Sequence, residues 1–199
     1  MTKMNLSTRL NLGFALVVSL FLVLAAFTAW RVTLVVQATT HMERSADLLK
    51  LAGSWQGDVR QNSARSLAVG YADGNGMLDF FKESMAATSA RTTETQKTFL
   101  AQVEDPASRQ RAETVGEVRK TWLAMRDRVN ALKTAGDNDG ARRLVRDEFV
   151  RVTDTYIAAT QALVDGEVDN VHQAQARVKT MFSQLLQLGA ALGVVTIVM

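Results

Sequence analysis

Four arginines are the residues of this chain whose type and spacing could do chemistry. Arg60 and Arg65 lie five residues apart, and Arg119 and Arg126 lie seven apart with Trp122 between them. Seven residues make about two turns of an α-helix, so Arg119, Trp122 and Arg126 would share one helix face. Guanidinium groups bind carboxylates through paired hydrogen bonds. These spacings predict a binding site for a small organic anion.

Two predicted helix stripes turn polar close to these arginines. On the first helix the stripe passes from small and apolar residues to polar ones; its positions include Ala46, Leu49, Gly53, Gln56, Arg60 and Ser63. On the second helix the polar positions are Thr88, Thr92 and Thr95. Polar groups inside a helical bundle need partners. We therefore expect Arg60 to point into the bundle, and Arg65, about 140° further around the helix, to point elsewhere, for example toward a second subunit.

Other kinds of chemistry find no support in the sequence. It holds no nucleophile elbow, phosphate-binding loop or paired-carboxylate motif, and it has no cysteine. His41 and His172 would lie at one height but off the stripes, and no Glu-x-x-His pattern accompanies them. The net charge of +3 comes from scattered basic residues, without a nucleic-acid-binding motif. We expect no enzyme activity, no metal, no cofactor and no nucleic-acid partner.

Turn signals indicate how the chain positions the arginines. Clusters rich in Gly, Asp, Asn or Pro stand at residues 73–76, 104–107 and 136–140. They leave helices that end near Tyr71, cover residues 77–103 and 107–135, and begin again near Ala141. Short turns between long helices make neighbours antiparallel. The sequence therefore predicts an all-α, up-down-up-down four-helix bundle that is continuous with two transmembrane helices.

Heights along such a bundle can be compared by counting. Each helical residue rises about 1.5 Å, so residues at one height on antiparallel helices have numbers with a constant sum. The counting brings polar positions from all four helices into one layer. The predicted ligand-binding residues are Arg60, Arg65, Thr88, Thr92, Arg119, Trp122, Arg126, Thr153 and Tyr156. The alternative is that the arginines extend along a solvated helix surface and the threonines only fill the core.

Two uncharged segments are long enough to cross a membrane. Residues 11–30 and 182–199 lack charged side chains, and a helix crosses the hydrocarbon core in about 20 residues. Lys3 and Arg9 place residues 1–10 in the cytoplasm. Residues 31–181 would then form the periplasmic domain of a multi-pass inner-membrane protein. The membrane-spanning helices of that protein would contact lipid. We expect the full-length protein to continue past a second span that is cut at Met199.

A cleaved signal peptide is the alternative for residues 11–30. The apolar run is too long for a typical signal peptide, and no small-x-small cleavage site precedes Trp30. A retained membrane anchor is therefore the prediction.

The opening MNLSTRLNLGFALVVSLFLVLAAF and the predicted bundle resemble the bacterial methyl-accepting chemotaxis receptors with a four-helix-bundle sensor domain. The resemblance implies a periplasmic, homodimeric sensor that binds amino acids or small organic acids. In the amino-acid receptors of this family, arginines on the first helix are spaced five and then four apart. Arg60 and Arg65 match, but Val69 stands at the third place. Arg119 and Arg126 suit the organic-acid receptors better, which implies a di- or tricarboxylate.

The resemblance also implies an output. A cytoplasmic part beyond these residues would contact the chemotaxis kinase and its coupling protein, and the signal would pass through the fourth helix and the second span. Two alternatives stay open. The same module could feed a histidine kinase or a diguanylate cyclase, or the chain could be a structural, membrane-anchored bundle without a small ligand.

Overall fold

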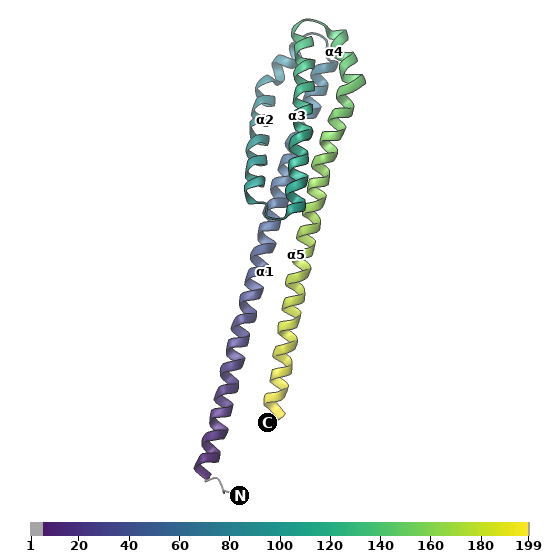
Figure 1. Ribbon diagram of the computed structural model, residues 1–199. Coiled ribbons are helices and arrows are strands. Elements are labelled where there is room, and N and C mark those ends of the chain that lie inside the picture. The colour runs from purple at the N-terminus through teal and green to yellow at the C-terminus, as the bar shows by residue number, and fades with distance from the viewer. Residues whose placement is uncertain (1–5, 199) are drawn as a thin grey trace. The chain divides into compact units, whose positions relative to one another are not determined.

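The computed structural model describes residues 6–198, which are helical apart from short turns and contain no strand (Figure 1). The elements are α1 (Leu6–Tyr71), α2 (Gly76–Gln102), α3 (Pro106–Thr134), α4 (Asn138–Leu144), the π-helical turn η1 (Val145–Phe149) and α5 (Val150–Val198). The all-α four-helix bundle is confirmed. The predicted ends of α2 and α3 each differ by one residue from the observed ones.

The chain forms two compact units. One is Arg44–His172, and the other combines Met1–Glu43 with Gln173–Met199. The first unit holds the four-helix bundle and all of the predicted ligand-binding residues. The limits expected for the periplasmic domain, residues 31 and 181, are wider than this unit, because they were taken from the ends of the apolar segments and not from helix packing.

The turns use the residues that their geometry requires. Gly74 and Gly136 have φ values of 64° and 79°, a region that glycine enters without steric cost. Asp105 caps α3 by accepting a hydrogen bond from the Ser108 amide at 2.8 Å, directly before Pro106 at the first turn. The helices thus begin and end where the local sequence favours it.

Hydrogen bonds between helices show which of them are neighbours in the bundle. One such bond joins each adjacent pair: Asn62 to Met85 (α1 and α2), Arg119 to Gln96 (α2 and α3), Trp122 to Thr153 (α3 and α5), and Gln56 to Gln161 (α1 and α5). Each helix is therefore beside the next one along the chain, and α5 closes the ring against α1.

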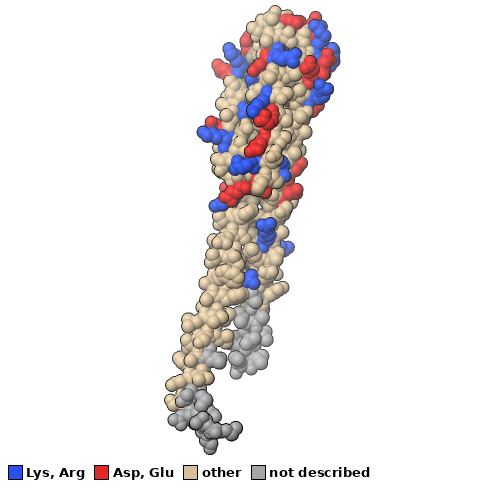
Figure 2. Space-filling model, viewed as in Figure 1, with Lys and Arg blue, Asp and Glu red and all other residues tan. Residues whose placement is uncertain are grey.

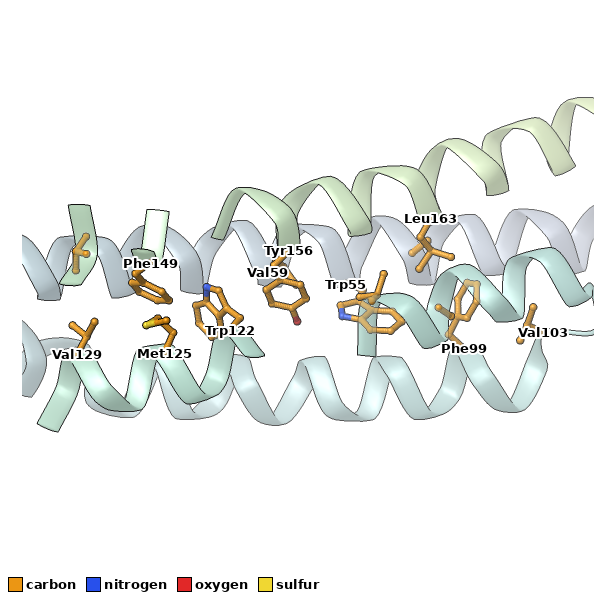
Figure 3. Packing of buried hydrophobic residues seen from close by; sticks show 14 of the residues in the cluster. Trp55, Val59, Phe99, Val103, Trp122, Met125, Val129, Phe149, Tyr156 and Leu163 are labelled. Carbon is orange, nitrogen blue, oxygen red and sulfur yellow. The ribbon is translucent and has the colours of Figure 1, made fainter. Parts of the chain in front are cut away.

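Aromatic side chains dominate the interior of the bundle (Figure 3). The Trp122 ring packs against Phe149 and Tyr156, with centroid distances of 5.7 and 5.6 Å. Further along the bundle, Trp55 meets the Phe99 ring edge-on at 6.4 Å. These contacts set how α1, α3 and α5 are rotated about their own axes.

The predicted stripe on α1 is wrong in register between Gly53 and Arg60. The predicted positions Gly53, Gln56 and Arg60 are not buried, whereas Ser63 is. The buried positions from residue 52 on are Ala52, Trp55, Val59, Asn62, Ser63, Ser66, Val69 and Gly70. Adjacent positions differ by about 100° around a helix, and small residues fit either stripe. Burial of the large Trp55 side chain, which is fully enclosed, selects the observed one.

The turn η1 shifts the buried stripe of the fourth helix. Its closing hydrogen bond runs from the Val150 amide to the Val145 carbonyl, five residues back. The wider turn makes Val145, Phe149 and Thr153 the successive buried positions. The steps of three and four expected for a regular α-helix select Val145, Phe149 and Val152 instead.

The second unit contains the apolar part of α1. Within the described residues one helix is long and apolar enough to cross a membrane; its most apolar 18-residue window has a mean hydropathy of 2.5 and no buried residue. In Figure 2 the charged side chains on the visible face gather on the unit Arg44–His172. Residues 1–5 and Met199, which belong to the expected cytoplasmic end and the second span, lie outside the described residues, as do most side chains after Gln187.

Candidate functional site

A small polar cavity lies inside the bundle, bordered by all four long helices. Its volume of about 10 Å³ is enough for one water molecule. Its lining residues are Asp58, Val59 and Asn62 from α1, Ser89 and Thr92 from α2, Arg119, Trp122 and Leu123 from α3, and Tyr156 from α5. The structure thus brings four predicted site residues to one cavity: Thr92, Arg119, Trp122 and Tyr156.

Arg119 carries the positive charge of this cavity. Its guanidinium donates to the Gln96 side chain at 3.0 Å, to the Thr93 hydroxyl at 2.8 Å and to the Ser89 carbonyl at 3.1 Å. All three acceptors are neutral and belong to α2. Among the described residues no ion pair involves Arg119, so its charge is solvated by dipoles alone.

Arg126 does not border the cavity but contacts Trp122, which does. Its guanidinium stacks over the Trp122 ring, with the central carbon 5.6 Å from the ring centroid. It forms an ion pair with Asp127 at 2.8 Å and donates to the Ser89 hydroxyl at 3.4 Å. Ser89 therefore contacts both Arg119 and Arg126, and Arg126 already has an anionic partner.

The wall formed by α3 and α5 is aromatic and tied by a hydrogen bond. The Trp122 indole N–H donates to the Thr153 hydroxyl at 3.1 Å, and both side chains are buried. Tyr156 lies beside Trp122 and is also buried (Figure 3). Burial raises the pKa of the Tyr156 hydroxyl to about 12, although Arg119 and Trp55 act in the opposite direction. This hydroxyl therefore stays neutral at physiological pH.

Arg60 and Arg65 of α1 take the reverse of their expected positions. Arg60 is exposed and donates to the Gln161 side chain at 2.9 Å. Arg65 is half-buried and donates to the Thr88 hydroxyl at 3.0 Å and the Ser84 carbonyl at 3.3 Å. The expectation that Arg60 points inward and Arg65 points away is wrong, because it followed from the incorrect α1 register.

Thr88 and Thr92 are both buried on α2, as the stripe predicted. Thr92 borders the cavity and donates its hydroxyl proton to the Thr88 carbonyl at 2.9 Å. Thr88 lies one turn away, where it accepts from Arg65. Arg65 and Thr88 therefore form a polar contact next to the cavity rather than part of its wall.

Sequence reasoning missed three polar residues that line the cavity, Asp58, Asn62 and Ser89. The Asn62 amide donates to the Met85 carbonyl at 3.1 Å and to the Ser89 hydroxyl at 3.2 Å. The signal for Asn62 was its place seven residues after Trp55, which puts both on one face of α1.

Metal chemistry has no candidate cluster in the described part of the chain. No group of three or more His, Asp or Glu side chains there could hold a metal ion. The arrangement offers instead a half-buried cation, neutral hydrogen-bonding groups and aromatic walls, a combination that is compatible with a small anion.

The family model described as a four helix bundle sensory module for signal transduction matches residues 3–182. The chain belongs to this family. The match extends through the bundle and its cavity, and it confirms the resemblance to the sensor domains of chemotaxis receptors. A search of curated proteins finds no match to the chain. As a sensory module, the protein has a role in signal transduction.

Proposed function

We propose that this sensory module is the periplasmic input of a chemotaxis receptor and that it binds a small organic acid in the cavity. The observation that carries the proposal is the state of Arg119. This cation borders a cavity shared by four helices and has only neutral acceptors. A carboxylate that replaced them would form charge-assisted hydrogen bonds, which are stronger than neutral ones.

Binding requires the cavity to open, because its present volume admits about one water molecule. Arg119 is held by three acceptors of α2, and Arg126 reaches the Ser89 hydroxyl of the same helix. A ligand carboxylate would compete with these groups, and α2 would move outward. Arg126 would then add a second donor for a di- or tricarboxylate.

A signal would leave the cavity through α5. Thr153 and Tyr156 belong to this helix and contact Trp122 from the cavity wall. A ligand that binds one position of α5 more tightly than another shifts the population between the two. A displacement of about 1–2 Å is the scale expected for such helix shifts.

The remaining parts of the proposal concern location and partners. Residues 11–30 and 182–199 would span the inner membrane, and two copies would form the homodimer. A cytoplasmic part of the full-length receptor would contact the chemotaxis kinase and coupling protein. The apolar, exposed surface of α1 before Arg31 and the family match support this arrangement.

The test is a ligand screen on the full chain in lipid nanodiscs. Thermal unfolding is followed in citrate, succinate, malate, aspartate and acetate, with chloride at matched ionic strength as the control. A ligand at 100 times its Kd stabilises the folded state by about 2.7 kcal/mol, so the binding acid should raise the Tm. If no acid raises the Tm beyond the chloride control, the chain is a structural bundle and the proposal fails.

A further inference from the structure

Asp58 on α1 is an anion at the edge of a cavity that otherwise suits anions. Its side chain borders the cavity and is 12% exposed. One carboxylate oxygen, Oδ1, accepts from Arg91 at 2.7 Å. The other, Oδ2, is buried and has no hydrogen-bond partner. Asp58 therefore has one satisfied oxygen and one open acceptor.

A buried carboxylate oxygen without a partner is unfavourable, because it has given up its hydrogen bonds to water. Two of the donors that border the cavity have acceptors elsewhere. The Asn62 amide donates to the Met85 carbonyl and to Ser89, and the Arg119 guanidinium donates to α2. A molecule in the cavity is placed to supply the donor that Asp58 Oδ2 lacks.

The chemistry of that molecule follows from the two charged groups. The Arg119 guanidinium would form an ion pair with a carboxylate, and Asp58 Oδ2 would accept a hydrogen bond from an N–H or O–H group. Both groups border the same cavity, so a ligand that contacts both carries its donor close to its carboxylate. An acid with an ammonium or hydroxyl group on the carbon next to its carboxylate meets both requirements.

We propose that Asp58 determines specificity by accepting a hydrogen bond from the 2-ammonium or 2-hydroxyl group of the acid whose carboxylate binds Arg119. This inference rests on the proposed function and names the ligand class for the same cavity. Arg91 neutralises the net charge of Asp58, so the carboxylate does not repel the incoming anion. The unsubstituted acids would leave Oδ2 without a partner and bind more weakly.

A single trapped water is the competing occupant of the cavity. The water could donate to Asp58 Oδ2 whether or not an acid is bound. In that case Asp58 would not distinguish one acid from another, and the comparison below would show no preference.

The experiment compares matched acids by titration calorimetry on the full chain in nanodiscs. One set is succinate, malate and aspartate, which differ only at carbon 2. The others are tricarballylate against citrate, in which the hydroxyl is on the central carbon next to a carboxylate, and glutarate against glutamate. A hydrogen bond to a charged group corresponds to about tenfold or more in affinity. We expect at least one substituted acid to bind about tenfold more tightly than its unsubstituted counterpart.

The Asp58→Asn variant locates the preference. It retains the side-chain shape and removes the carboxylate, so the substituted acid should lose about tenfold in affinity while the unsubstituted acid changes little. Asp47→Asn is the matched control, since Asp47 is exposed on the same helix. Circular dichroism confirms that each variant is folded.

The outcomes separate the two proposals. If acids bind but substituted and unsubstituted ones bind equally in the wild-type chain, the role of Asp58 is refuted and the proposed function stands. The same conclusion follows if the preference survives in Asp58→Asn. If Asp58→Asn does not fold, the wild-type comparison alone decides. If no acid in any set binds, the proposed function itself fails.

Discussion

The Trp122 indole N–H donates to the Thr153 hydroxyl at 3.1 Å across the buried boundary between α3 and α5. Trp122 also carries the Arg126 guanidinium on its ring and borders the cavity that contains Arg119. The residue between the two arginines is thus bonded directly to the helix that would carry the signal. Under the proposed function, this hydrogen bond would couple a change in the position of α3 side chains to α5.

The first prediction concerns the strength of that bond. Thr153→Val keeps the side-chain volume but leaves the buried Trp122 N–H without an acceptor, which should lower the free energy of unfolding by about 1–3 kcal/mol. Urea unfolding of the full chain in nanodiscs measures the change. Thr155→Val is the control, because the Thr155 hydroxyl bonds only to its own helix at the Arg151 carbonyl and the residue is exposed. Equal effects of the two substitutions would contradict the prediction.

The second prediction separates the arginines by position. Arg119→Ala removes the uncompensated cation and should weaken binding of the acid found in the screen by about tenfold or more. Arg60→Ala should change the affinity less than twofold, on the order of the scatter for a surface substitution, because Arg60 is exposed and bonded to Gln161. Calorimetry measures both. A larger loss for Arg60→Ala than for Arg119→Ala would move the site to the surface of α1.

The third prediction uses two glycines of α1. A Cβ atom on Gly70 would overlap Val145 Cγ2 of η1 and lie 3.2 Å from Val129 Cγ1, whereas a Cβ atom on Gly53 meets nothing within 4 Å. Gly70→Ala should therefore destabilise the fold by about 1–3 kcal/mol through overpacking. Gly53→Ala should stabilise it by about 0.5–1 kcal/mol, as alanine does in a helix interior. Thermal unfolding of the two variants checks both signs, and a stabilising Gly70→Ala would disprove the close contact.

The fourth prediction concerns acid. The Ser108 amide, which donates to the Asp105 carboxylate, lowers the pKa of Asp105 below its ordinary 3.8. Since the folded-state pKa is the lower one, the stabilisation is fully present above pH 3.8 and is lost as the pH falls through the folded-state value. Asp105→Ala should cost about 1 kcal/mol at neutral pH, the usual value of a helix cap.

The acid range provides the control for this cap. Below the folded-state pKa the wild-type chain and Asp105→Ala should unfold at similar denaturant concentrations. A difference that stays constant from pH 7 down to pH 2 would show that the carboxylate charge has no part in the cap.

Much of the site was accessible from the sequence because helix geometry is regular. The turn clusters divided the chain, and the constant rise per residue brought Thr92, Arg119, Trp122 and Tyr156 to one height before any contact was known. On α2 the predicted positions Thr88 and Thr92 are buried, and on α3 steps of seven residues join Val115, Trp122 and Val129, which are also buried, because these side chains leave one face to bury. Counting residues along a helix needs only the rise per residue, and neighbouring residues in the sequence determine where each helix begins and ends.

Rotation of a helix about its own axis is a different quantity, and the tertiary structure decided it. On α1 two adjacent stripes were possible, and the packing of Trp55 against Phe99 selected the one that turns Arg60 outward and brings Arg65 against Thr88. In the same way the wider turn η1 accompanies burial of Thr153, whose hydroxyl accepts from the Trp122 indole, in place of the stripe position Val152. The unpartnered Oδ2 atom of Asp58 could be identified only from tertiary contacts, since Arg91 bonds to Oδ1 and the Asn62 amide bonds to α2. The sequence by itself determined the helices and their heights along the bundle, because both depend on residues that are neighbours in the chain. The tertiary structure decided which side chains contact one another, because that depends on how all four helices pack around one core.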